Sequence, residues 1–211
     1  MSENPSTETA RRVRGATRTK MLVSAVEVLR ERGAAGVTID EVLARSGAPR
    51  GSVYHHFPDG RSQILREALN FAGDEITASI DEAAGESATV LLRRFVQLWE
   101  DSLTESNYTA GCPVLAAAVG SGEDEQQLTA VAADIFSRWR DASKQAYIRD
   151  GFEPAEATSL ADTTIAAMEG AAVLCRSARS LEPLYDVANQ LEFLIKAKEF
   201  VMRFGVPTLN A

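Results

Sequence analysis

The segment at positions 38–57 constrains the fold most, because it places two short helical patterns on either side of a tight turn. Thr38 is a favourable N-cap, with Glu41 three residues later as its capping-box partner, and the helix that they begin ends at Gly47. Pro49 suits the first turn of the next helix, which ends before a Pro-Asp-Gly break. Two short helices joined by a turn of about four residues with a glycine are typical of a helix-turn-helix.

Helical patterns account for the rest of the chain as well. An amphipathic helix precedes the helix-turn-helix, with apolar residues from Leu22 to Leu29 and a stop at Gly33. Further helices are expected over about 62–84, 88–104, 113–119, 124–149, 154–179 and 184–204. No segment alternates with a period of two residues, so the sequence predicts an all-α fold.

Three parts follow from this pattern. Residues 1–16 are polar, rich in Ser, Thr and Arg and without apolar periodicity, which predicts a disordered basic arm. Residues 17–62 form the predicted three-helix DNA-binding module. Residues 63–211 form a helical body, whose long helices suit dimerisation and a cavity between helices.

The charge is divided unevenly between these parts. Residues 1–66 carry 11 Lys and Arg against 7 Asp and Glu, whereas residues 67–211 carry 11 against 23, and the chain has a net charge of −8. A basic head on an acidic body indicates that only the head approaches a polyanion.

Several classes of protein and site are not expected. No apolar stretch follows the N-terminal arginines, and no segment offers the roughly 20 apolar residues that cross a bilayer, so we expect a cytoplasmic protein without a membrane segment. Cys112 and Cys175 lack metal-ligand spacing and are interpreted as buried thiols. His55 and His56 diverge by about 100° on a helix, which disfavours a shared metal. We expect neither a metal nor a cofactor.

The second helix of a helix-turn-helix lies in the major groove, and this one is rich in hydrogen-bonding side chains. Val53 and Phe57, four residues apart, give it an inner apolar face, and Gly51 allows the backbone to approach a phosphate. The donors lie at Arg50, Ser52, Tyr54, His55 and His56. Such residues are also common on solvated helix faces, so this composition alone leaves both interpretations open.

Three stretches of the head share a pattern with a known family. They are the helix with Ala25 and Leu29, the residues Gly-Val-Thr-Ile at 36–39, and Gly-Ala-Pro-Arg-Gly-Ser-Val-Tyr-His-His-Phe at 47–57. In this spacing the head resembles the TetR family of transcriptional regulators. The resemblance covers residues 17 to about 70, and the remainder is similar in length and helical character.

Two positions depart from the family pattern. Ala48 stands where the family usually has a Ser or Thr N-cap, and Gly60 stands where it has a lysine, with Arg61 one position further on. The longer turn after Phe57, together with Gly-Cys-Pro at 111–113, is similar to the LmrA/YxaF branch of the family.

The resemblance and the donor chemistry together imply roles in DNA binding. Phosphate contacts are expected from Thr38, Tyr54, His56 and Arg61, and base contacts from Arg50, Ser52 and His55. Arginines of the arm either follow the DNA or form a solvated tail; they are Arg11, Arg12, Arg14 and Arg18.

The body suits both dimerisation and ligand binding, because long helices with small and apolar residues pack closely and enclose cavities. The residues expected at the dimer interface are Ala167, Gly170, Ala171, Leu174, Leu191 and Ile195. The residues expected around a small hydrophobic effector are Phe95, Trp99, Cys112, Leu115, Phe136, Met168 and Glu169. The resemblance supports both assignments, since the last two helices of the family form a bundle across a two-fold axis and an effector releases the DNA. Apolar residues at this spacing are also common in ordinary cores, and Glu169 would equally suit an ion pair.

We therefore expect a ligand-responsive repressor that binds a palindromic operator as a homodimer and is released by a small hydrophobic effector. The alternative is an architectural or adaptor protein whose helical body binds a protein, which would show an exposed apolar patch and a filled core. No nucleophile, base and orienting group can be assembled from local motifs, so an enzyme is not expected.

Overall fold

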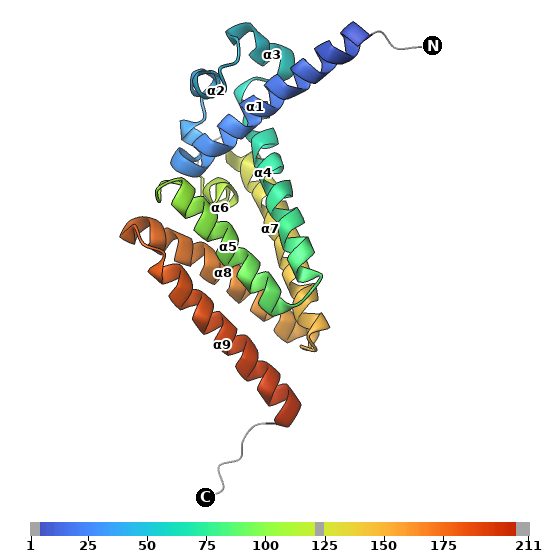
Figure 1. Ribbon diagram of the computed structural model, residues 1–211, viewed down its shortest axis with the longest axis vertical. Coiled ribbons are helices and arrows are strands. Elements are labelled where there is room, and N and C mark those ends of the chain that lie inside the picture. The colour runs from blue at the N-terminus through green and yellow to red at the C-terminus, as the bar shows by residue number, and fades with distance from the viewer. Residues whose placement is uncertain (1–4, 121–124, 206–211) are drawn as a thin grey trace, which may run out of the picture. The chain divides into compact units, whose positions relative to one another are not determined.

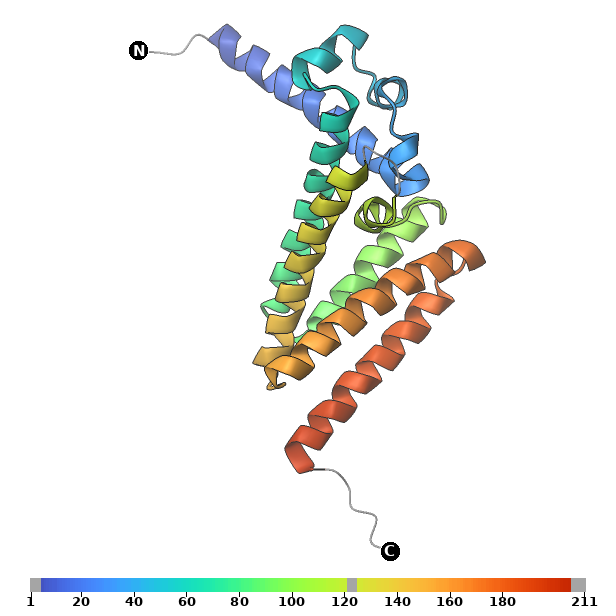
Figure 2. The same cartoon turned by 180° about the vertical axis from the view of Figure 1, so that it is seen from behind.

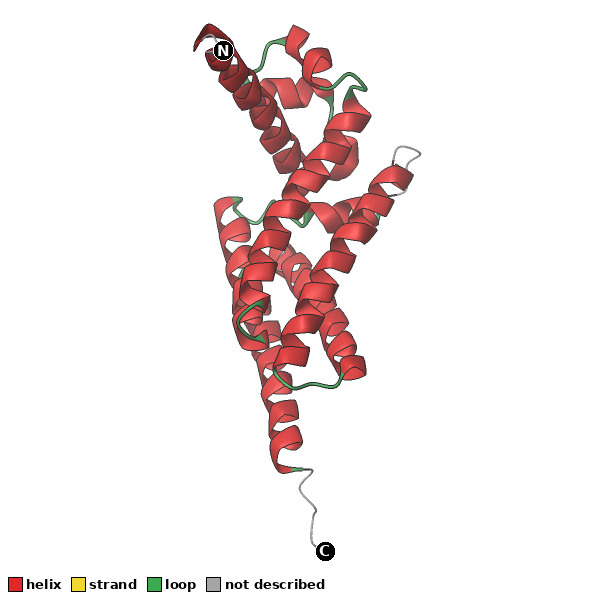
Figure 3. Cartoon of the chain, turned by 90° about the vertical axis from the view of Figure 1, so that its right-hand side faces the viewer, coloured by secondary structure: helices red, strands yellow, loops and turns green. Residues whose placement is uncertain are grey.

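A computed structural model of the protein describes residues 5–120 and 125–205, with side chains described over 15–120 and 126–205. Within these ranges the chain folds into helices joined by turns and loops and contains no strand (Figures 1 and 3), which confirms the predicted all-α fold. In order, the elements are α1 (Pro5–Gly36), α2 (Ile39–Ser46), the 3₁₀ turn η1 (Arg50–Ser52), α3 (Val53–His56), α4 (Arg61–Ala84), α5 (Ala88–Glu105), α6 (Pro113–Ala118), α7 (Glu125–Arg149), α8 (Pro154–Ala178) and α9 (Glu182–Phe204).

The first helix is longer than the sequence predicted. α1 begins at Pro5, so the expectation of a disordered arm is wrong for residues 5–16, while residues 1–4 lie outside the described ranges. The Ala, Glu and Arg residues of this segment are good helix formers, and extending an existing helix costs far less than nucleating one. The predicted stop at Gly33 is a kink, because its φ of 69° interrupts the helix before Gly36.

The chain divides into two compact units. The first combines residues 1–74 with residues 112–135, and the second combines residues 75–111 with residues 136–211. The first unit therefore adds the start of α4, α6 and the first half of α7 to the predicted DNA-binding module. Within it, α1 packs against α2 and α6.

In the second unit, α8 packs along α9, and α5 packs against both of them (Figure 2). Its core contains polar side chains that satisfy one another. The indole N–H of Trp139 donates to Thr77 Oγ1 at 2.9 Å, and the hydroxyls of Tyr147 and Thr164 lie 2.7 Å apart. Burial raises the pKa of the Tyr147 hydroxyl, so it remains protonated and able to donate. None of the described helices is both long and apolar enough to cross a membrane.

At Gly73, α4 lies close against Ile135 of α7 in the first unit. A Cβ atom built at this position would lie 2.5 Å from Cδ1 and 2.9 Å from Cγ1 of Ile135. Ile135 is 1% exposed, and its β-branched side chain has little freedom to move aside. The sequence therefore needs glycine here for packing.

We expect Gly73→Ala to lower the free energy of unfolding by about 1–3 kcal/mol, because the added methyl group overpacks the contact with Ile135. Urea denaturation measures the change. Gly15→Ala in α1 is the control, since a Cβ there meets no atom within 4 Å and gains helix propensity. Equal stability of the two variants would contradict this account of the packing.

Candidate nucleic-acid interface

The helix-turn-helix is fixed to α1 through Arg45 near the end of α2. Its Nη2 lies 2.7 Å from a carboxylate oxygen of Glu31 on α1, and its Nε lies 2.9 Å from Glu41. The hydrogen bond from Arg45 lowers the pKa of the Glu31 carboxyl, opposed by desolvation. Because this pKa is lower in the folded protein, the pair stabilises the fold at neutral pH and loses its effect as the pH falls through the folded pKa.

The ends of α2 lie where the sequence predicted them. Thr38 Oγ1 accepts a hydrogen bond from the Glu41 amide at 3.1 Å, and Gly47, with φ 65°, ends the helix by donating to the carbonyl of Leu43. The Glu41 carboxylate bonds to Arg45, and that ion pair ties the start of α2 to its end.

The recognition segment is formed by η1 and α3 and is not one regular helix from Pro49. The N-cap position of η1 is Pro49, which makes no side-chain capping bond, and the first turn has 3₁₀ geometry. The Ser52 hydroxyl donates to the carbonyl of Pro49 at 2.6 Å.

The two faces of this segment separate as the sequence predicted. Val53 and Phe57 are fully buried. Tyr54 is 63% exposed, the Arg50 side chain is 80% exposed, and His55 is exposed as well. Among the described side chains, the outer face therefore offers an arginine, a phenol and an imidazole within one turn and a half of chain. These are groups that donate to phosphates and to base edges.

Gly60 explains one departure from the family pattern. Its φ of 64° lies in the left-handed region, and a Cβ built on it would lie 3.5 Å from the Tyr54 ring and 3.9 Å from Ile39. These are ordinary van der Waals distances, so it is the left-handed backbone that favours glycine at this position.

The structure gives Arg61 partners that the sequence did not indicate. Its Nε donates to the carbonyl of Val37 and its Nη2 to the carbonyl of Ala34, both at 2.7 Å. The guanidinium thus caps the C-terminal end of α1. The phosphate contact expected from Arg61 stays a prediction, and these bonds show that a large part of its donor capacity is in use.

The arginines expected along the DNA are only partly described. Arg18 pairs with Glu67 of α4 and lies over the Phe57 ring, 5.1 Å from its centroid, so it holds the module together. The side chains of Arg11, Arg12 and Arg14 lie outside the described ones.

The structure distributes the seven expected effector residues over both units. Cys112 and Leu115 belong to the first unit, where Cys112 caps α6 by accepting from the Leu115 amide at 3.4 Å. The second unit holds Phe95, Trp99, Phe136, Met168 and Glu169. Of these, Phe95, Trp99 and Met168 are buried, on the mutually packed helices α5 and α8, and Phe136 packs edge-to-face on Trp139.

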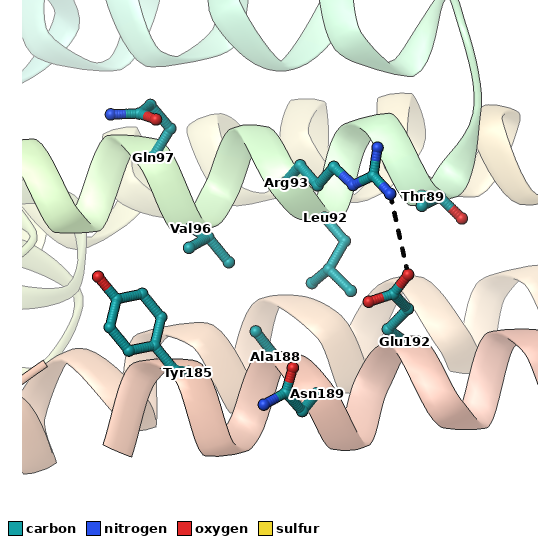
Figure 4. A pocket seen from close by; sticks show the side chains of 9 residues that line it. All are labelled: Thr89, Leu92, Arg93, Val96, Gln97, Tyr185, Ala188, Asn189 and Glu192. Carbon is teal, nitrogen blue, oxygen red and sulfur yellow. Dashed lines mark ion pairs between the residues drawn. The ribbon is translucent and has the colours of Figure 1, made fainter. Parts of the chain in front are cut away.

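A groove lies between α5 and α9, with a volume of about 310 Å³ (Figure 4). Leu92 and Val96 of α5 face Ala188 of α9, and an ion pair between Arg93 and Glu192 closes one end. None of the seven residues that the sequence indicated lines this groove. The sequence pattern of α5 and α9 did not indicate this groove.

The six residues expected at the dimer interface divide by burial. Ala171, Leu191 and Ile195 are at most 6% exposed and lie in the subunit's own core. Leu174 is 55% exposed and Gly170 is also exposed, while Ala167 is half-buried.

Other apolar side chains on α8 and α9 also face outward, at Val173, Phe193, Phe200, Val201, Met202 and Phe204. Phe193, Phe200 and Phe204, spaced by seven and four residues, share one face of α9, a signal that the sequence analysis missed.

Sequence comparison matches both parts of the chain to known families. Residues 21–68 match the model described as bacterial regulatory proteins, tetR family, and residues 88–190 match that of the transcriptional regulator LmrA/YxaF-like C-terminal domain. An HTH-type transcriptional regulator of Mycobacterium tuberculosis, itself uncharacterized, is 41% identical over 186 residues, which cover 86% of this chain and 95% of that protein.

The chain belongs to the TetR family of transcriptional regulators. LmrA of Bacillus subtilis is 26% identical, over 86% of this chain and 98% of the relative. A TetR regulator structure from Chloroflexus aurantiacus superposes with a TM-score of 0.74 at 22% identity, covering 88% of this chain and 96% of that one. One from Legionella pneumophila gives 0.73 at 17%, covering 83% and 95%. The structural matches show that the fold is shared.

Membership confirms the predicted class, a DNA-binding transcriptional regulator and not an enzyme. Regulators of this family bind operator DNA and typically act as dimers. In this TetR-family regulator, the helix-turn-helix lies within residues 21–68, which match the tetR family model.

The contacts of Arg61 lead to a prediction for the fold of this module. Arg61→Met leaves the carbonyls of Ala34 and Val37 without these donors, and we expect the free energy of unfolding to fall by about 1–3 kcal/mol. Arg50→Met, at an exposed position of the same module, should change it by less than about 0.5 kcal/mol. Chemical denaturation measures both variants. If Arg61→Met is as stable as the wild type, the capping role is refuted.

Proposed function

We propose that this protein is a cytoplasmic, ligand-responsive TetR-type repressor that binds a palindromic operator as a homodimer and is released by a small hydrophobic effector. The observation that carries the DNA-binding part is the outer face of the recognition segment. Arg50, Tyr54 and His55 point their donors away from a core that buries Val53 and Phe57, so the segment can enter a groove without unfolding.

The proposed homodimer is supported by the exposed apolar side chains of α8 and α9. Phe193 is 69%, Leu174 55% and Val173 52% exposed, which is costly in water unless another surface covers them. A second copy of the chain would do so symmetrically and would present two recognition segments to a palindrome. In this arrangement Gly170, Ala167 and Leu174 lie near the partner, whereas the buried Leu191, Ile195 and Ala171 support the face from inside.

The effector is proposed to bind in the second unit, where α5 and α8 carry Phe95, Trp99 and Met168. Apolar walls with a few polar groups suit a small hydrophobic molecule. The buried hydroxyls of Tyr147 and Thr164 in the same unit are the kind of group that orients such a ligand.

Release of DNA then follows from a population shift. The effector must bind the DNA-incompetent arrangement more tightly than the competent one, and a coupling of about 1–3 kcal/mol corresponds to a loss of about 5- to 150-fold in operator affinity. α4 supplies residues to both units, and its movement is proposed to transmit effector binding to the DNA-binding module.

The same exposed apolar residues also suit the alternative, an adaptor whose helical body binds a different protein. The oligomeric state separates the two functions, because a dimer would already cover them.

Selection of bound duplexes from random DNA tests the DNA-binding proposal, and we expect a palindromic sequence to be enriched. Arg50→Ala should relax the preference at particular base pairs by about 5- to 150-fold, because it removes a bidentate base contact. Tyr54→Ala should weaken binding to all duplexes alike, because it removes a phosphate contact. Arg93→Ala, which removes a positive charge from α5, is the control. Unchanged affinity and preference in both head variants would refute the assignment.

Phe193→Glu tests the dimer. We expect this variant to be monomeric in sedimentation analysis and to lose affinity for the palindrome, because a carboxylate would be buried without a partner at the interface. Gln145→Glu adds the same charge at an exposed position of α7 and should remain dimeric. A wild-type monomer would favour the adaptor.

A further inference from the structure

An ion pair joins α2 to the 3₁₀ turn η1 on the exposed side of the DNA-binding module. Asp40, the second residue of α2, accepts a hydrogen bond through Oδ1 from Nη2 of Arg50, the first residue of η1. The Asp40 side chain is 75% exposed and that of Arg50 is 80% exposed. Ten residues of chain separate the two.

Asp40 lies in the first turn of α2, where a carboxylate interacts favourably with the helix dipole, and Asp40→Glu would keep that interaction. Ion pairs between exposed side chains contribute little to folding. A negative charge beside the recognition segment repels the phosphates of a duplex and weakens non-specific binding. Asp40 therefore opposes the positive charge of the module that carries it, and its contact with Arg50 gives it a further effect, on the position of that side chain.

The hydrogen bond restrains the side chain that is best suited to read a base. A free arginine samples many rotamers, and ordering it on a base costs conformational entropy. The carboxylate uses one of the five guanidinium N–H groups. A bidentate contact with guanine needs two of the remaining ones, so Arg50 can be held by Asp40 and still read a base.

We propose that Asp40 is a specificity-determining positioning residue, which orients Arg50 so that its remaining N–H groups read a guanine in the major groove. The inference rests on the proposed base-reading function of the recognition segment. It predicts that Asp40 raises discrimination between sequences while lowering the affinity for DNA in general.

The experiment compares full-length variants on the duplex that the wild type selects and on duplexes changed at the base pair that loses its preference in Arg50→Ala. We expect Asp40→Asn to reduce this discrimination by about three- to tenfold, the effect of ordering one long side chain. Its affinity for random duplex should be equal to or higher than that of the wild type. Asp40→Glu keeps the charge and should restore part of the discrimination.

Asp59→Asn is the matched control. Asp59 is an exposed carboxylate of the same module, in the turn after α3. Its replacement should raise the affinity for random duplex but leave the discrimination unchanged. In an Arg50→Ala background, Asp40→Asn should produce no further loss of discrimination, because the residue acts through Arg50.

Two results would overturn the inference while leaving the proposed function intact. One is a wild-type level of discrimination in Asp40→Asn. The other is a loss that persists in the Arg50→Ala background or that follows a fall in the thermal midpoint, since either would make the effect one of helix stability. A wild-type protein without any base preference would refute the proposed function itself, and this inference with it.

Discussion

The recognition segment depends on the burial of two side chains. A four-residue helix preceded by a 3₁₀ turn has too few hydrogen bonds to be stable alone, and no side chain caps either element. Its geometry comes from Val53 and Phe57, which are fully enclosed, and from Arg18, which lies over the Phe57 ring. The backbone that carries the outward donors is held in place because the inner face is packed into the core.

Around this core, some arginines stabilise the fold and another is exposed for the proposed recognition of DNA. Arg45 and Arg61 bind carboxylates and backbone carbonyls within the first unit, where planar guanidinium groups satisfy several acceptors at once. Arg50, by contrast, is exposed and has an exposed partner. A positive charge in a basic module is therefore not by itself a sign of DNA contact, and the acceptors around each arginine decide its role.

The features that the sequence predicted well are those set by neighbours within four residues. The N-cap Thr38 and the stop at Gly47 bind the backbone of their own helix, so α2 was placed correctly. Arg61 could not be assigned in this way, because its acceptors lie 24 and 27 residues earlier. On α9, periodicity shows two apolar faces but not which one turns inward. Leu191 and Ile195 fill the subunit's core while Phe193 and Phe200 remain outside, because the choice depends on how α5 and α8 pack against the helix.

The discontinuous make-up of the first unit has a consequence for how the protein can be dissected. The first unit also contains residues 112–135, which follow residues 75–111 of the second unit along the chain. Helix α6 of this stretch packs against α1. A fragment ending near residue 74 would leave the surface of α1 that faces α6 in water, and Gly73 without Ile135 against it. Because two separate stretches of chain make up this unit, no single cut releases it complete.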